Sequence, residues 1–286
     1  MPVVGVLTDS CASIPEALIE KLRIEVVPYY MHRGLETLRD LVDVQREEFF
    51  RWLPTAQELP KTANPGPGDY LEAFKGLAQR TREIVSIHMT SVGSGAYQSA
   101  MTAKEMAREA LPDLRIEVMD SRNVSLCQGW MVIEAARAAL SGESLDDIVR
   151  LVGEMIPKTR MIQTADTLRY LYMGGRIGKA QHLVGSLLRI KPLIGMADGV
   201  IVPLGTTRSR RKAYARMAEM MEEAVGYMGR VKVAFVHAAA LEEIEKLQAE
   251  VEQRLTCVET LVAELSPVLG VHTGPGTAGV CYFPVD

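Results

Sequence analysis

The sequence is poor in aromatic side chains and has no excess of positive charge. Phe, Trp and Tyr make up 6% of the 286 residues, so the hydrophobic core must be mainly aliphatic. Lys and Arg number 32 against 36 Asp and Glu, which gives a formal net charge of −4. Nucleic acids and anionic membranes select a basic protein surface. Neither is therefore expected as a partner of this chain.

The chain also lacks the cysteine patterns of metal sites and of disulfide-rich domains. Its 4 cysteines lie far apart, with no C-x-x-C pair. No apolar run approaches the length of a membrane-spanning helix, and the N-terminal segment lacks the positive charge of a signal peptide. We therefore expect no bound metal, no disulfide framework, no membrane-spanning segment and a cytoplasmic location.

Short β-branched runs alternate with segments of helical periodicity, which predicts an α/β fold. Val3–Leu7 is almost continuously apolar and predicts a strand of a parallel sheet, whereas Leu126–Leu140 predicts a helix. The charged, aperiodic stretch Met31–Asp43 predicts a loop. In the second half, Ala197-Asp198-Gly199 between two apolar runs predicts a hairpin, and a hairpin among crossover connections implies a mixed sheet.

The change of pattern near residues 155–160 predicts two domains. The first, residues 1–156, is expected to be a three-layer α/β domain with a parallel sheet. The second, residues 157–286, is expected to be an α/β domain with a mixed sheet. A helix is predicted to begin near Ser13, which would be its N-cap.

A serine between two glycines stands where a predicted strand turns into a predicted helix. The segment is Gly93-Ser94-Gly95. The first N–H groups of a helix have no intrahelical acceptor, and the helix dipole favours negative charge there. The turn therefore predicts an anion site in which Ser94 supplies a hydroxyl, although an ordinary serine N-cap explains the pattern equally well. Thr62 lies in a Pro/Gly-rich loop before another predicted helix and can supply a second hydroxyl.

Three further motifs match only in part. Residues 274–279 fit G-x-G-x-x-G, but a predicted strand follows where a dinucleotide site needs a helix. Residues 174–180 resemble a P-loop, but Ala180 stands where that motif needs Ser or Thr. The nucleophile elbow of esterases needs glycines two residues on either side of its serine, and Val92 and Ala96 occupy those positions around Ser94. We therefore expect no nucleotide cofactor.

Several short segments carry a resemblance to a known family. They read Thr8-Asp9-Ser10, Lys61-Thr62-Ala63-Asn64-Pro65, Ser91-Val92-Gly93-Ser94-Gly95-Ala96-Tyr97-Gln98-Ser99-Ala100, Tyr170-Leu171-Tyr172-Met173-Gly174-Gly175-Arg176-Ile177-Gly178, Ile190-Lys191-Pro192 and His272-Thr273-Gly274-Pro275-Gly276. In sequence and in order they resemble the motifs of the DegV family of bacterial fatty-acid-binding proteins. The resemblance covers essentially the whole chain.

The resemblance implies two α/β domains with one long-chain fatty acid bound between them. Residue by residue, it implies that Thr62, Ser94 and the N–H of Gly95 hold the carboxylate. It places Arg176 and His272 at the mouth of that site; His272 lies in a Pro/Gly-rich segment that predicts an exposed loop. It also implies a carrier without catalytic residues, which presents the acid to a separate fatty-acid kinase that makes an acyl phosphate for phospholipid metabolism.

The same residues leave two other functions open. A serine acyl hydrolase would use Ser94 as nucleophile and His272 as base, with Asp9 or Asp120 as the orienting acid. A binder of phosphorylated metabolites would use the same helix terminus together with the cations of residues 176–179, but such a site needs more convergent cations than these motifs supply.

Overall fold

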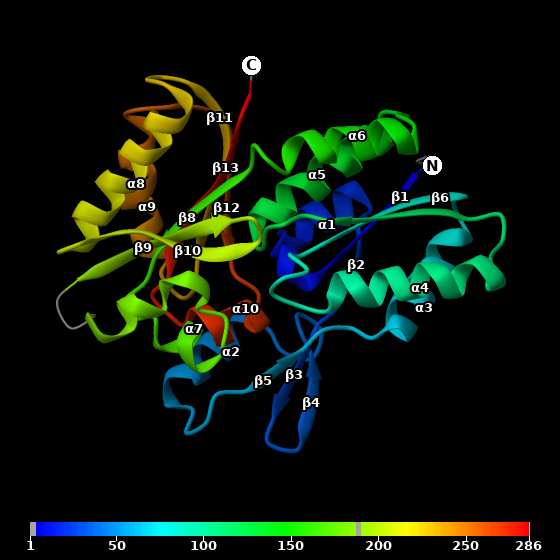
Figure 1. Ribbon diagram of the computed structural model, residues 1–286, viewed down its shortest axis with the longest axis horizontal. Helices are drawn as coiled ribbons and strands as arrows, with labels where there is room; N and C mark the ends of the chain where they lie inside the picture. The colour runs from blue at the N-terminus through cyan, green and yellow to red at the C-terminus, as the bar shows by residue number, and fades with distance from the viewer. Residues whose placement is uncertain (1–3, 187–189, 286) are drawn as a thin grey trace. The chain divides into compact units, whose positions relative to one another are not determined.

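The computed structural model describes residues 4–186 and 190–285, whose elements are drawn in Figure 1. They form two compact units. Unit 1 comprises Met1–Asp43 and Thr62–Pro157, and unit 2 comprises Val44–Lys61 and Lys158–Asp286. The chain thus enters unit 2 early, returns to unit 1, and leaves it again. The predicted boundary after residue 156, in contrast, leaves residues 44–61 in the N-terminal domain.

Aromatic packing explains this early excursion. Helix α2 (Arg46–Trp52) buries Phe49 and Phe50, and both rings lie against helix α10 (Pro267–Thr273) of the same unit. A Cβ atom at Gly270 would come within 2.7 Å of Phe49 and 2.6 Å of Phe50, so glycine is needed at this position. The two helices are far apart in the sequence, and no local pattern connects them.

Unit 1 is built on a parallel sheet of four strands in the order β2-β1-β6-β7. The strands are β1 (Val4–Asp9), β2 (Glu25–Val27), β6 (Glu83–His88) and β7 (Arg115–Asp120). In Figure 1 one face is covered by α3 (Pro67–Ala78) and α4 (Ala96–Ala110), and the other by α1 (Glu16–Leu22), α5 (Leu126–Leu140) and α6 (Leu145–Met155). A parallel sheet between two layers of helices confirms the three-layer fold predicted for the N-terminal part.

Local patterns account for most of these elements. Every residue of β1 is buried, as expected for a strand with helices on both sides. The helix α4 presents a row of alanines to the sheet, and all of them are buried: Ala96, Ala100, Ala103 and Ala107. One helix start is wrong in the prediction. Ser13 has a left-handed φ of 52° and ends a short 3-10 helix, and α1 begins only at Glu16 after Pro15.

The predicted loop over Met31–Asp43 is also wrong. The segment contains an antiparallel hairpin of β3 (Tyr30–Arg33) and β4 (Glu36–Arg39), which belongs to a small sheet in the order β4-β3-β5, with β5 at Lys61–Ala63. The turn uses Gly34, whose φ is +61°. Strands this short and charged show no hydrophobic alternation, so their pairing leaves no periodic signal.

Unit 2 contains a mixed sheet of six strands in the order β10-β9-β8-β13-β11-β12, in which the β11–β12 pair is parallel and the other pairs are antiparallel. Its strands are β8 (Arg160–Thr164), β9 (Lys191–Ala197), β10 (Val200–Thr207), β11 (Arg230–His237), β12 (Thr256–Glu264) and β13 (Ala278–Pro284). This confirms the predicted mixed sheet. The predicted hairpin is confirmed as well, since β9 and β10 meet at Asp198 and Gly199, which have φ values of 50° and 77°.

The remaining helices of unit 2 are α7 (Arg169–Met173), α8 (Arg210–Val225) and α9 (Leu241–Glu252). Short 3-10 helices also occur in the chain: η1 (Ser10–Ala12), η2 (Leu53–Thr55) and η3 (Gly178–Ser186). The helices α8 and α9 pack on the sheet through a core that includes Tyr214, Met217 and Phe235. Within the described ranges no helix is both long and apolar enough to cross a bilayer.

Candidate functional site

The predicted anion site lies at the turn from β6 to α4 in unit 1. Gly95 is the N-cap of the helix and has no side chain that could cap it. The first N–H groups of α4 therefore have neither an intrahelical acceptor nor a capping side chain from this residue. Ser94 precedes the cap, so the interpretation of Ser94 as an ordinary N-cap is wrong. A helix of this length with an uncapped, glycine-led N-terminus favours a negative charge at its end.

Thr62 does not lie in a loop, as its Pro/Gly-rich surroundings predict, but in the edge strand β5, and the residue directly after this strand is anchored to α4. Asn64, two residues after Thr62, donates from its side-chain nitrogen to the hydroxyl of Ser99 in the first turn of α4 at 3.1 Å. The same nitrogen donates to the carbonyl of Pro65 at 2.8 Å. A Cβ atom on Gly95 would lie 3.0 Å from the Asn64 side-chain oxygen, so glycine allows Asn64 to approach this closely. The structure therefore brings the end of the Thr62 strand and the Ser94–Gly95 turn together.

Tyr29 is a further residue of this site that the sequence analysis does not identify. Its hydroxyl lies 2.7 Å from that of Ser94, and its side chain is only 4% exposed. The residue follows β2 after Pro28, at the carboxyl end of a strand of the parallel sheet. Polar residues at that edge are a usable signal, since Asp9 ends the neighbouring strand β1 and Ser94 follows β6. The pairing of Tyr29 with Ser94, 65 residues away, had no signal in the sequence.

The phenol of Tyr29 is held in its neutral form. Burial raises the pKa of Tyr29 well above its usual value of 10, and negative charge on Cys11 or Asp9 would raise it further. The thiol of Cys11 is likewise buried, and burial raises its pKa well above 9. Both groups therefore keep their protons at neutral pH, and neither can act as a base toward Ser94.

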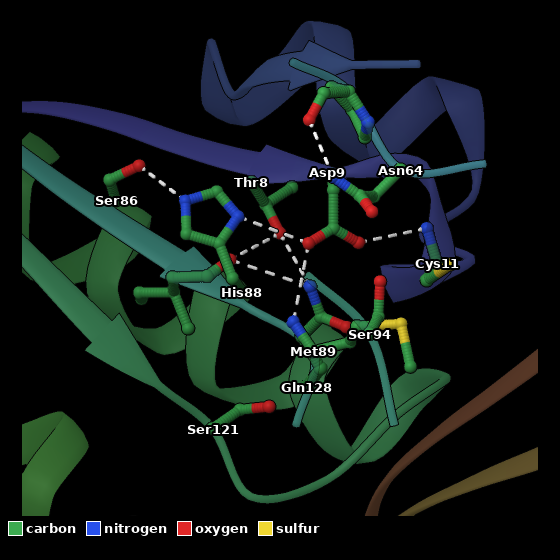
Figure 2. A network of polar contacts seen from close by, with 12 residues as sticks. Thr8, Asp9, Cys11, Asn64, Ser86, His88, Met89, Ser94, Ser121 and Gln128 are labelled. Carbon is green, nitrogen blue, oxygen red and sulfur yellow. Dashed lines mark hydrogen bonds and ion pairs between the residues drawn. The ribbon is translucent and has the colours of Figure 1, made fainter. Parts of the chain in front are cut away.

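Asp9, His88 and Ser86 form a buried chain of hydrogen bonds beside this turn (Figure 2). The carboxylate of Asp9 lies 3.0 Å from Nδ1 of His88, and Nε2 of His88 lies 2.6 Å from the hydroxyl of Ser86. The order Ser–His–Asp is that of a hydrolase triad. All three side chains are inaccessible, however, each with 0% exposure. In this buried arrangement the bond between Asp9 and His88 links strand β1 to strand β6.

Arg176 and His272 belong to unit 2, where they meet around Gly174. Nη1 of Arg176 donates to the carbonyl of Gly174 at 2.8 Å, and a Cβ atom on Gly174 would collide with the ring of His272. The preceding helix α7 ends at Gly174, and the next residue, Gly175, has a φ of +68°, which confirms the predicted left-handed glycine at this turn. Arg176 is exposed, with its guanidinium available to a ligand or partner.

His272 does not lie in a loop, as the Pro/Gly-rich sequence predicts, but in the last turn of α10. Ser266 caps this helix by accepting from the N–H of Leu269, and Pro267 occupies its first turn. Burial, and then the positive charge of Arg176, lower the pKa of His272 to about 4. At neutral pH the imidazole is therefore uncharged, and Arg176 is the cation of this pair.

The five predicted site residues thus fall into two sets: Thr62, Ser94 and Gly95 in unit 1, and Arg176 and His272 in unit 2. The hydroxyl of Ser94 is bonded to a phenol and not to a histidine of its own unit. Among the residues that the structure describes, no group of three or more His, Cys, Asp or Glu side chains is arranged to hold a metal ion.

Comparison with known proteins gives a consistent result. A family model described as "Uncharacterised protein, DegV family" matches residues 3–285. A DegV domain-containing protein of Caldanaerobacter subterraneus is 33% identical over 282 residues, which cover 99% of each chain. A DegV family protein from Thermus thermophilus, described by its fatty acid binding, has a TM-score of 0.92 at 28% identity, with 100% of both chains covered. DegV from Bacillus subtilis, described as a fatty acid binding protein, has a TM-score of 0.86 at 30% identity over 100% of both chains.

Proposed function

This chain belongs to the DegV family, and from that premise we propose that it binds one long-chain fatty acid and acts as a carrier without catalytic activity of its own. The similarity to the fatty-acid-binding proteins of Thermus thermophilus and Bacillus subtilis extends over the full length of the chain. The ligand-binding part of those folds therefore has its counterpart here. No cofactor is needed for this function.

The observation that carries the proposal is the uncapped N-terminus of α4 beside two hydroxyl-bearing segments. Helix N–H groups and the hydroxyls of Ser94 and Thr62 are donors without negative charge, which suits a carboxylate. We assign the carboxylate to Thr62, Ser94 and the N–H of Gly95. The link between Asn64 and Ser99 supports this assignment, because it keeps the end of the Thr62 strand at the helix terminus before any ligand arrives.

The energetics explain why donors are required at the head group. Burying about 15 methylene groups at roughly 0.8 kcal/mol each gives about 12 kcal/mol in favour of binding. Loss of translational and rotational freedom costs at least about 4 kcal/mol, and an uncompensated buried carboxylate costs several more. A carrier therefore needs hydrogen bonds to the carboxylate to retain a useful affinity.

Within this carrier function we also assign a role to Arg176 and His272. We propose that they take part in presenting the bound acid to a fatty-acid kinase, which transfers a phosphoryl group to its carboxylate. Exposed Arg176 offers a planar cation that can contact phosphoryl oxygens in a bidentate manner. His272 is uncharged at neutral pH, since its pKa is lowered to about 4, and so it can donate or accept a hydrogen bond without adding charge.

Organic extraction of the purified protein, followed by mass spectrometry, tests the proposal. We expect a near-stoichiometric acid of about 14 to 18 carbons, and stearate should rebind after the protein has been delipidated. Denatured protein carried through the same extraction is the control for adventitious lipid. A phosphorylated metabolite in the extract, or failure of the delipidated protein to bind stearate, would reject the carrier function.

A further inference from the structure

Both backbone polar groups of Tyr29 make buried hydrogen bonds to other segments of unit 1. Its backbone N–H donates to the hydroxyl of Ser10 at 3.1 Å, and its carbonyl accepts from the N–H of Asp40 at 2.8 Å. Ser10 in turn donates to the carboxylate of Asp40 at 2.6 Å, so the two residues that bind the backbone of Tyr29 are also bonded to each other. All of these groups are buried. The backbone of Tyr29 is therefore held in place by hydrogen bonds that do not include Ser94.

The direction of the hydrogen bond between Tyr29 and Ser94 follows from the neighbours of the phenol. The Tyr29 hydroxyl lies 2.7 Å from the hydroxyl of Ser94, and the buried thiol of Cys11 is close enough to affect its titration. A neutral thiol is a weak acceptor, whereas a serine hydroxyl is a good one. Cys11 keeps its proton, because burial raises the pKa of its thiol well above 9. A phenol is also a stronger donor and a weaker acceptor than an aliphatic hydroxyl, so in the 2.7 Å contact the phenol proton goes to the oxygen of Ser94.

We propose that Tyr29 is a positioning residue for the head-group site: it donates to Ser94 and turns the Ser94 O–H away from itself, toward the ligand. This inference rests on the proposed function, because it assumes that Ser94 contacts the head group. It adds a chemical restriction to that function. With Tyr29 as the donor, Ser94 offers the ligand a hydrogen and not a lone pair, so the site selects head groups that accept hydrogen bonds, such as a carboxylate.

The first measurement compares stearate affinity of delipidated protein across matched variants, by titration calorimetry. Tyr29→Phe removes only the phenol oxygen and keeps the ring, and we expect it to weaken binding about tenfold, as for one lost hydrogen bond of a charged ligand site. Tyr30→Phe is the control, since the neighbouring Tyr30 donates to Asp69 at 2.9 Å and is unconnected with Ser94. Its affinity should stay within about twofold of the wild type.

A double-mutant cycle separates positioning from a purely structural role. If Tyr29 acts through Ser94, Tyr29→Phe should have no further effect on affinity once Ser94 is alanine. If the two losses add, Tyr29 acts independently of Ser94 and the inference is overturned, although the proposed function stands. If Ser94→Ala alone leaves affinity unchanged, the head-group assignment itself fails.

A spectroscopic measurement gives an independent answer at saturating ligand. Stearate labelled with carbon-13 at the carboxyl group reports the hydrogen bonds that the carboxylate receives. In Tyr29→Phe its resonance should move toward the position found in Ser94→Ala, and in Tyr30→Phe it should not move. An unchanged resonance in Tyr29→Phe would show that Ser94 keeps its orientation without the phenol, and would overturn the inference.

Discussion

Asp9 and His88 are joined across strands β1 and β6 by a hydrogen bond of 3.0 Å between two side chains that have no exposure to solvent. The same carboxylate also accepts from the N–H of Met89 at 3.2 Å and from the N–H of Cys11 at 3.1 Å. Met89 is the first residue after β6, where the chain begins its turn toward Ser94 (Figure 2). Asp9 therefore fixes the starting point of the turn that carries the head-group site.

Removal of this carboxylate should destabilise unit 1 strongly. Asp9→Ala leaves a buried histidine and two backbone N–H groups without their acceptor, and each buried donor left unsatisfied costs about 1–3 kcal/mol in the free energy of unfolding. Asp9→Asn keeps one acceptor oxygen and should cost less. Asp43→Ala, which removes an exposed carboxylate paired with Arg39, should change stability little. Urea unfolding of delipidated protein measures all three, and a loss below about 1 kcal/mol for Asp9→Ala would contradict this account.

The sequence predicts the elements that depend on local periodicity. Four buried alanines of α4, spaced three or four residues apart, and the continuous burial of β1 follow from the pattern of apolar residues. The start of α10 was also readable, because Ser266 and Pro267 form a common helix start. The glycines that follow His272 are typical of a loop, and for this reason the sequence predicts a loop at His272 instead of a helix.

Contacts between distant segments leave no such signal. The packing of α2 on α10 depends on Gly270 admitting two phenylalanine rings, and the residues involved lie more than two hundred positions apart. The contact between Tyr29 and Ser94 depends on the order of strands in the parallel sheet, which periodicity does not determine. The resemblance to DegV motifs identified Ser94 and Thr62 as candidates, but it did not identify the tyrosine beside Ser94.

Loss of either head-group hydroxyl should weaken fatty-acid binding. Thr62→Ala and Ser94→Ala each remove a hydrogen bond to a charged group, roughly 1.5–3 kcal/mol, or about ten- to a hundred-fold in affinity. Ser94→Ala also removes the partner of the buried Tyr29 hydroxyl, so its delipidated form should melt slightly lower than that of Thr62→Ala. Thr102→Ala on the exposed side of α4 is the control, since the Thr102 hydroxyl donates to the carbonyl of Gln98 within the same helix. Stearate titrations unchanged in both site variants would rule out this position of the carboxylate.

His272 should make the stability of the protein depend on pH in a defined window. Its pKa is lowered from 6.5 to about 4 in the folded state, mainly by burial. The unfolded chain therefore binds a proton more readily, so this stabilising contribution is complete above about pH 6.5 and is lost as the pH falls toward 4. His272→Asn should flatten the slope of unfolding free energy between these values, relative to the wild type. An identical slope in the two proteins would show that His272 is not buried in its neutral form.

The hydrolase alternative predicts ester cleavage, which we do not expect. The nucleophile would need a base, and Ser94 is bonded to a phenol whose pKa is raised well above 10, so this neighbour cannot take its proton at neutral pH. With p-nitrophenyl esters of medium and long chains, the wild type should release no product above the uncatalysed background, and Ser94→Ala should behave alike. A burst of product that disappears in Ser94→Ala would favour the hydrolase.

Substitutions in unit 2 should impair presentation of the fatty acid to the kinase without impairing fatty-acid binding. Arg176 is exposed, and its guanidinium contacts the carbonyl of Gly174, while His272 packs against the same glycine. Burial of the acyl tail is expected to supply most of the binding free energy, and polar side chains such as these two add little to it. We expect Arg176→Ala and His272→Ala to retain bound fatty acid but to reduce acyl-phosphate formation by a cognate kinase about tenfold or more, as for a lost charge-assisted contact. Arg169→Ala is the matched control, because Arg169 is a cation of the adjacent helix α7 whose contact is with Met173.

The measurement is paired for each variant: occupancy by mass spectrometry and turnover of the bound acid with purified kinase. Turnover must be compared at equal occupancy, so that a loss of ligand is not mistaken for a loss of phosphoryl transfer. If occupancy collapses in Arg176→Ala and His272→Ala while the remaining acid turns over normally, the two residues anchor the ligand and have no part in presentation. If Arg169→Ala impairs turnover equally, the effect comes from the general charge of this surface and not from the Gly174 cluster. Only a defect in turnover confined to Arg176 and His272 supports the assignment, because those two side chains share the contact with Gly174 that Arg169 lacks.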